Sequence, residues 1–219
     1  MLPLRDTIPS ARVPIVTWLL IIVNGAVFLH ELQIGTHLEA LIRAYGLVPR
    51  HFSVATLLTS MFLHGGWLHL FGNMLYLYIF GDNVEDRLGH VRYLVLYLLC
   101  GMAAGSAQVL MNPRSGLPID GASGAIAGVL GAYFLFFPQA RVVTLVPIFL
   151  FLQVMEIPAV AYLLLWFVFQ VFSGIGAHGS TAGGVAVWAH VGGFVAGMVL
   201  GPVLRIRRSP PPGEWSRAG

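Results

Sequence analysis

Two residues in apolar surroundings, Ser123 and His190, are of the types that together perform acyl transfer. A serine hydroxyl is a weak nucleophile until a neighbouring base takes its proton, and imidazole is the most common base for this task. Ser123 lies in Gly121-Ala122-Ser123-Gly124, directly after a loop at 112–120. Glycine lets another backbone come close, and the free N–H groups of a helix that begins at the serine favour a developing negative charge. The pattern predicts a nucleophile beside an anion-stabilising helix end.

His69 and Asn73 are candidates for further donors to an oxyanion. They are four residues apart, so on one helix their side chains share a face. An imidazole, a carboxamide and the Ser123 N–H are the kinds of donor that stabilise a tetrahedral intermediate. His64 lies five residues before His69, nearer the start of that helix. These residues complete the set of groups that acyl transfer requires.

Each of these residues also has a simpler interpretation when it is considered alone. A serine among small residues often serves helix packing, and a lone histidine in a membrane helix is often a hydrogen-bonded core residue. The spacing Gly193-x3-Gly197 by itself indicates only close helix packing. His64, His69 and Asn73 could instead form an ion-binding or transport site. The occurrence of all these residues together favours acyl transfer.

The composition indicates a membrane protein. Of the 219 residues, 57% are hydrophobic and 10% are charged, whereas a soluble domain has about 25% charged residues. The basic residues are all arginines that lie singly or beside apolar runs, which is typical of topology determinants and unlike a nucleic-acid-binding face. We therefore expect the lipid bilayer as a partner and no nucleic acid.

Six segments are apolar enough to be spans, since a span needs about 20 apolar helical residues. They are 13–32, 57–80, 93–111, 121–138, 157–173 and 183–204. The apolar run at 142–155 is too short to cross and is expected to be interfacial or re-entrant. The predicted fold class is all-α, a six-helix membrane domain at 13–204 between an N-terminal segment, 1–12, and a disordered tail, 205–219.

The arginines also predict the orientation of this bundle. With the N-terminus in the cytoplasm, nine of them lie inside, namely Arg5, Arg12, Arg87, Arg92, Arg141, Arg205, Arg207, Arg208 and Arg217. Only Arg43, Arg50 and Arg114 lie outside. Cytoplasmic loops carry an excess of basic residues, so both termini are expected in the cytoplasm. At the rise of an α-helix, His69, Ser123 and His190 then share one layer in the outer half of the bilayer.

Two further segments and several single residues can also be interpreted from the sequence. The segment 33–56 is expected to form one structured outer loop, and the glycine-rich 173–184 is a candidate cap over the site. Asp120 is interpreted as a solvated turn or cap residue, and Glu31 as interfacial. Gln170 is a polar residue in the fifth span that needs a partner. Cys100 is the only cysteine, which excludes an intrachain disulfide and a cysteine-rich metal site.

Over residues 45–201 the chain resembles the rhomboid family of intramembrane serine proteases. The segments 58–66 and 81–89 contribute to the resemblance. The most specific motifs, in chain order, are His64-x4-His69-x3-Asn73, Gly121-Ala122-Ser123-Gly124 and Ala189-His190-Val191-Gly192-Gly193-x3-Gly197.

The resemblance implies a role for each motif residue. Ser123 would be the nucleophile, and His190 the general base and then the general acid. His69, Asn73 and the Ser123 N–H would form the oxyanion hole. His64 and Gly121 would be auxiliary. Gly193 and Gly197 would pack the sixth helix against the fourth.

The resemblance also implies the reaction. This would be hydrolysis of a peptide bond in or next to a transmembrane segment of a membrane protein, through an acyl-enzyme and without a cofactor or a metal. The alternative is a catalytically silent relative that binds or chaperones transmembrane clients. Composition and the lack of an organelle-targeting pattern suggest a bacterial inner membrane. The natural substrate, the cleavage-site preference and the oligomeric state are not predicted.

Two positions depart from the pattern of many relatives. The first outer loop has Ala55 and Thr56 where relatives carry a Trp-Arg pair. Ala127 occupies the position four residues after the serine, where some relatives have an aromatic ring that stacks on the histidine. Support for the His190 ring is therefore expected from another part of the chain.

Overall fold

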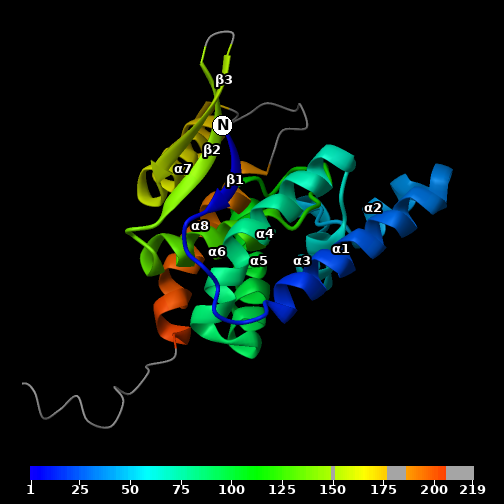
Figure 1. Cartoon of the computed structure of the whole chain (residues 1–219). Helices are drawn as coiled ribbons and strands as arrows, with labels where there is room; N and C mark the ends of the chain where they lie inside the picture. The colour runs from blue at the N-terminus through cyan, green and yellow to red at the C-terminus, as the bar shows by residue number, and fades with distance from the viewer. Residues whose placement is uncertain (149–150, 177–185, 206–219) are drawn as a thin grey trace, which may run out of the picture.

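The computed structural model describes residues 1–148, 151–176 and 186–205, and most of them are helical (Figure 1). The helices are α1 (Ile15–Ile34), α2 (Leu38–Tyr45), α3 (Val54–Thr59), α4 (Trp67–Leu88), α5 (His90–Met111), α6 (Ser123–Phe136), α7 (Ala159–Gly176) and α8 (Val187–Leu204). Short 3-10 turns lie at Gly35–His37, Pro49–His51 and Ser60–Phe62. The strands are β1 (Leu2–Asp6), β2 (Arg141–Ile148) and β3 (Phe151–Pro158).

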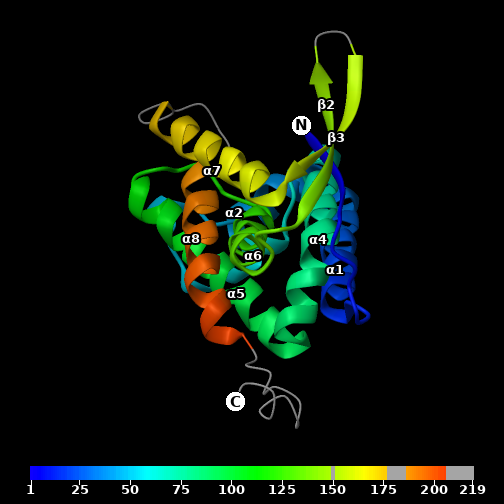
Figure 2. The ribbon, with the colours of Figure 1, turned by 60° about the vertical axis from the view of Figure 1, so that its left-hand side comes forward.

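Helix α6 is the centre of the bundle. In Figure 2 it is seen end-on, with α4, α5, α7 and α8 around it. Its residues from Gly124 to Tyr133 are all buried, and glycines recur along it. Small residues let neighbouring helix backbones come close, which compensates for the absence of a hydrophobic driving force between helices in lipid. The sequence of α6 therefore suits a helix surrounded by other helices.

The surrounding helices bury one side and expose large apolar side chains on the other. Ile22 on α1, Leu110 on α5 and Val203 on α8 are 61%, 79% and 74% exposed. Exposed apolar surface of this extent is unfavourable in water and favourable in a bilayer. The protein is therefore an integral membrane protein.

By length and composition, three helices of the described chain can each cross a membrane. These are Ile15–Tyr45, which continues α1 through α2, together with α5 and α8. The pair Val54–Phe62 and Trp67–Leu88, bent by 92°, counts as a fourth if it is one span, and α6 and most of α7 are shorter apolar helices. Each of the six predicted segments thus contains apolar helix.

The second predicted span, 57–80, is wrong at its start. The chain turns sharply after Phe62, and the long helix α4 begins only at Trp67. Leu63 has extended backbone, and Gly65-Gly66 follows, a pair that disfavours a continuous helix. His64 therefore lies in the connection before α4 and not on the helix that carries His69 and Asn73.

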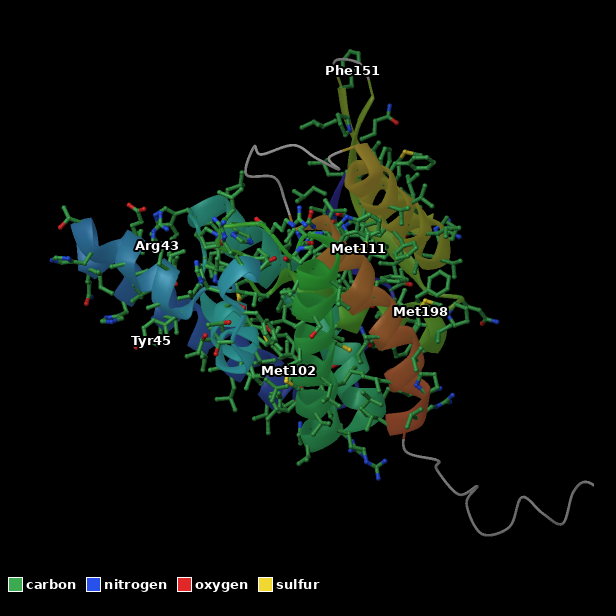
Figure 3. All side chains as sticks on the ribbon, turned by 180° about the vertical axis from the view of Figure 1, so that it is seen from behind. Arg43, Tyr45, Met102, Met111, Phe151 and Met198 are labelled. Carbon is green, nitrogen blue, oxygen red and sulfur yellow. The ribbon has the colours of Figure 1, made fainter. Side chains whose placement is uncertain are left out.

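The expected all-α fold is also corrected, because the structure contains a three-stranded antiparallel sheet in the order β1-β2-β3. The described residues of the run at 142–155 belong to the antiparallel hairpin strands β2 and β3, in which Val142 pairs with Ile157 and Val146 with Gln153. β-branched residues such as Val142, Val143 and Thr144 favour strands. Figure 3 shows Phe151 near the tip of this hairpin, away from the helices. The N-terminal segment is part of the same sheet, since Leu2 pairs with Leu145.

Contacts at one end of the bundle bring together the start of α1, the α4–α5 turn and the end of α8 (Figures 1 and 2). The buried Glu85 carboxylate on α4 accepts hydrogen bonds from the Val16 and Thr17 N–H groups at 2.8 Å. Arg92 at the start of α5 donates to the Leu204 carbonyl at 3.4 Å. The starts of α6 and α8 lie at the opposite end, where the site is found.

The remaining predictions concern connections. The segment 33–56 was predicted to be one outer loop. It is structured, but it is not a single loop, because it contains the end of α1, α2, which continues that helix, and the start of α3; Figure 1 shows α2 extending away from the bundle. In the predicted cap at 173–184, Ser173 to Gly176 belong to α7, and from 177 onward it lies outside the described residues. The predicted tail lies outside them from 206 onward.

Candidate active site

Ser123 and His190 are in direct hydrogen-bonding contact. Ser123 is the first residue of α6, and His190 lies in the first turn of α8. The distance from Ser123 Oγ to His190 Nε2 is 2.8 Å, a normal length for a hydroxyl that donates to an imidazole. The His190 side chain is buried, with 7% of the residue exposed. This is the geometry in which an imidazole takes a proton from a serine.

Glycines on both helices explain how α6 and α8 come this close. A Cβ added at Gly193 would collide with the carbonyl oxygen of Gly124, and a Cβ at Gly197 would collide with the carbonyl oxygen of Gly128. The two backbones are therefore in contact over more than a helical turn. The contact begins one residue after Ser123 and three after His190, so it sets the separation of the two side chains.

The second nitrogen of His190 has a partner on α7. Gln170 Oε1 lies 2.9 Å from His190 Nδ1. Trp166, one helical turn earlier, places its ring 5.8 Å from the His190 ring, centroid to centroid. These two side chains of α7 are thus the contacts that support the His190 ring, as expected from another part of the chain. The sequence marked Gln170 as a polar residue in need of a partner, but nothing in its spacing indicated that the partner is His190.

His69 and Asn73 are both on α4 and both face Gly121. A Cβ at Gly121 would lie 2.6 Å from His69 Nε2 and 3.6 Å from Asn73 Nδ2. Gly121 has φ +116°, a conformation that side chains rarely permit, and its N–H donates to the Ser60 carbonyl at 2.9 Å. The two side-chain donors are thus held close to the backbone that leads into Ser123.

His64 supports this pair from the connection before α4. Its Nε2 lies 3.0 Å from Asn73 Nδ2, and its ring meets the His69 ring edge-on at 5.1 Å. The His64 N–H is within 3.2 Å of a carboxylate oxygen of Glu31 on α1. Glu31 is 2% exposed, so its interpretation as an interfacial residue is wrong. The hydrogen bond from the His64 N–H offsets part of the cost of burying the Glu31 carboxylate.

Asp120 is also more enclosed than expected. Its side chain is 22% exposed, and Asp120 Oδ2 lies 3.8 Å from His69 Nδ1. Burial raises the pKa of the Asp120 carboxyl, and the neighbouring His69 opposes that shift. Among the described residues, Oδ2 has no hydrogen-bond donor. Asp120 is therefore partly enclosed, and its interpretation as a solvated residue is wrong.

Several of these groups line one cavity of about 850 Å³, whereas His64, Gly121, Gln170 and Glu31 lie outside its lining. Ser123, His190, His69, Asn73 and Asp120 form its polar part. Its other walls come mainly from α4, α6 and α7 and include Trp67, Leu68, Tyr76, Ile126, Leu130 and Trp166. A few convergent polar groups within an apolar cavity are typical of a ligand-binding or active site.

Comparison with known proteins identifies the family. A family model described as Rhomboid domain matches residues 51–207. RHOMBOID-like protein 4 of Arabidopsis thaliana is 36% identical over 151 residues, which are 69% of this chain and 34% of that protein. Rhomboid protein 1, mitochondrial, of Saccharomyces cerevisiae is 30% identical over 190 residues, covering 80% of this chain and 51% of the relative.

A bacterial relative is similar over a shorter segment. Rhomboid protease GluP of Bacillus subtilis is 43% identical over 76 residues, 35% of this chain and 14% of that protein. The matched part of this chain thus spans about a third to a half of the length of the longer-matching relatives. The family model covers most of the chain, including every motif residue described above. The chain therefore belongs to the rhomboid family.

Proposed function

We propose that this protein is a serine endopeptidase that hydrolyses peptide bonds in or next to transmembrane segments of other membrane proteins. The observation that carries the proposal is the 2.8 Å hydrogen bond between Ser123 Oγ and His190 Nε2 in a cavity with further donors. A serine that serves only helix packing does not require an imidazole partner or an adjoining cavity. Membership of the rhomboid family, in which one relative is named a protease, gives additional support.

In the acylation step, Ser123 Oγ attacks the carbonyl carbon of the substrate peptide bond while His190 Nε2 takes the hydroxyl proton. The carbonyl oxygen becomes negatively charged, and the donors that stabilise it are the Ser123 N–H, His69 and Asn73. The first N–H groups of α6 have no partner within the helix, and the helix dipole favours negative charge at this end. His190 then gives its proton to the leaving amine, and the acyl group remains on Ser123.

In the deacylation step, water replaces the amine. His190 takes a proton from a water molecule, which attacks the acyl carbon, and Ser123 Oγ regains its proton as the acid product leaves. Water must therefore reach Ser123, and the polar lining formed by His69 and Asp120 offers a path through the cavity. The apolar walls suit the side chains of a transmembrane substrate.

For the topology we propose six crossings, with both termini in the cytoplasm and the site in the outer half of the bilayer. Supporting this, the Glu85 and Arg92 contacts put the start of α1 and the end of α8 at one end of the bundle. Arg12, Arg87 and Arg205 lie near those helix ends. The substrate partners would be membrane proteins within the same bilayer. The relatives come from a plant, a yeast and a bacterium, so they do not single out the bacterial inner membrane that composition suggested.

The proposal is tested by covalent labelling of the detergent-purified protein with a fluorophosphonate, which reacts with activated serines. We expect labelling of the parent and none of the variants Ser123→Ala and His190→Ala. Cys100→Ser, a change at a buried residue outside the site, is the matched control and should retain labelling. A folded parent that stays unlabelled would instead favour the client-binding function.

A further inference from the structure

We propose that Gln170 is a positioning residue for His190, which its side-chain oxygen holds in the tautomer that accepts a proton from Ser123. This inference rests on the proposed function, because it assigns a partner to the base of the same site. Neither the family motifs nor the sequence spacing points to this residue. The evidence is the position of α7 against the starts of α6 and α8.

The first step concerns the proton on the imidazole. A neutral imidazole carries one proton, on Nδ1 or on Nε2, and the bare nitrogen is the acceptor. Gln170 Oε1 can only accept, and it lies 2.9 Å from Nδ1, so this contact requires the proton on Nδ1. The lone pair of Nε2 then faces the Ser123 hydroxyl at 2.8 Å. In the other tautomer, Nε2 carries a proton and cannot act as the base.

The second step concerns the orientation of the ring. One hydrogen bond leaves an imidazole free to tilt, and Trp166 limits this motion with a ring at 5.8 Å, inclined by 40°. Trp166 also meets Phe194 at 6.0 Å, one turn along α8 from His190. Gln170 and Trp166 are four residues apart on α7, so they present a single face to α8.

The same face of α7 continues one turn further, to Tyr162. The Tyr162 hydroxyl lies 2.7 Å from the hydroxyl of Tyr76 on α4. Tyr162, Trp166 and Gln170 thus recur every four residues and attach α7 to both sides of the cavity. The orientation of His190 consequently depends on where α7 is docked, which sequence order alone does not reveal.

The chemistry of an amide sets the size of the effect. Gln170 is neutral, so it orients the imidazole without the charge that a carboxylate offers the imidazolium. Without Gln170, the His190 ring should be poorly oriented. A misplaced catalytic group can lower the rate by about 10²-fold. A carboxylate at the same position should keep the acceptor and in addition stabilise the protonated ring.

The test measures the rate of fluorophosphonate labelling against pH for the parent, Gln170→Leu and Gln170→Glu. We expect Gln170→Leu to label about 10²-fold more slowly at an unchanged melting temperature. Gln170→Glu should retain the rate at high pH, with the acid-side decline moved to higher pH. His69 and Asp120, which share the cavity with His190, are unchanged in all variants. Phe169→Leu, at an adjacent and 63% exposed side chain of α7, is the control and should match the parent.

A second measurement does not require activity. In protein labelled with 15N-histidine, the ring nitrogen signals that vanish in His190→Ala report the tautomer of His190. The parent should carry the proton on Nδ1, and Gln170→Leu should lose this preference. The inference would be overturned if Gln170→Leu were labelled as fast as the parent, or if Gln170→Leu and Gln170→Glu lowered the labelling rate equally. An unchanged tautomer in Gln170→Leu would also overturn it. An unlabelled parent that shows the expected tautomer shift would reject the proposed protease and leave the positioning role intact.

Discussion

Gly193 on α8 packs against the carbonyl oxygen of Gly124 on α6 so closely that no side chain fits between them. Gly124 follows Ser123 directly, and Gly193 is three residues from His190. The separation of the two helix backbones therefore controls the separation of the hydroxyl and the imidazole. A change in the packing of α6 against α8 should therefore change the distance between Ser123 and His190.

Gly193→Ala should separate α6 from α8. The added methyl meets backbone, which cannot rotate away, so we expect a loss of stability of about 1–3 kcal/mol or more and a marked loss of labelling. Thermal unfolding in detergent and fluorophosphonate labelling measure the two effects. The control is Gly25→Ala on α1, where an added Cβ has no neighbour within 4 Å. Equal behaviour of the two variants would contradict the packing role of Gly193.

Gly121→Ala should disturb the oxyanion donors without disturbing the hydrogen bond between Ser123 and His190. Its Cβ would lie 2.6 Å from His69 Nε2, and φ +116° is unfavourable for alanine. Displacing one oxyanion donor typically lowers kcat by about 10²–10³-fold. Gly116→Ala, in the same connection between α5 and α6 and with no neighbour within 4 Å, is the matched control. Cleavage of a transmembrane model substrate should be slow in the first variant and normal in the second.

Glu85→Ala should weaken the end of the bundle opposite the site. The Glu85 carboxylate accepts the N–H groups of Val16 and Thr17, and Glu85 Oε1 lies 2.6 Å from His90 Nδ1. Each buried donor that loses its acceptor costs about 1–3 kcal/mol, so the melting temperature should fall strongly. Glu39→Ala breaks only the exposed pair with Arg43, a pair worth about 0–1 kcal/mol. A similar melting temperature for both variants would argue against the role assigned to Glu85.

Asp120→Asn should change the pH dependence of cleavage. Ionised Asp120 Oδ2 lies 3.8 Å from His69 Nδ1, so it places a negative charge beside this proposed oxyanion donor and helps to orient its ring. Because burial raises the pKa of Asp120, this benefit should be lost on acidification at a higher pH than for an exposed aspartate. The variant should cleave more slowly at neutral pH and lack this part of the acid-side decline. Superimposable pH profiles would show that Asp120 does not act on His69.

The sequence determined the kinds of residue at the site and the apolar helices that carry them. Ser123 at a helix start, His69 and Asn73 on one helix, and the glycines of α8 follow from short-range spacing, because helical geometry repeats within a few residues. The apolar length of the segments predicted a membrane bundle, since backbone groups in lipid must be satisfied within helices. The ordered motifs predicted the family, which the comparisons confirm.

The tertiary structure alone decided which distant residues become partners. Gln170 reaches His190, Glu31 reaches the His64 N–H, and the N-terminal strand pairs with the run at 142–155 that was expected to be interfacial or re-entrant. Each of these pairings joins different elements, and none leaves a local pattern, because a buried polar group needs only some partner and its sequence does not specify which. The identity of the partner is set by how the helices dock, and docking depends on the packing of the whole bundle.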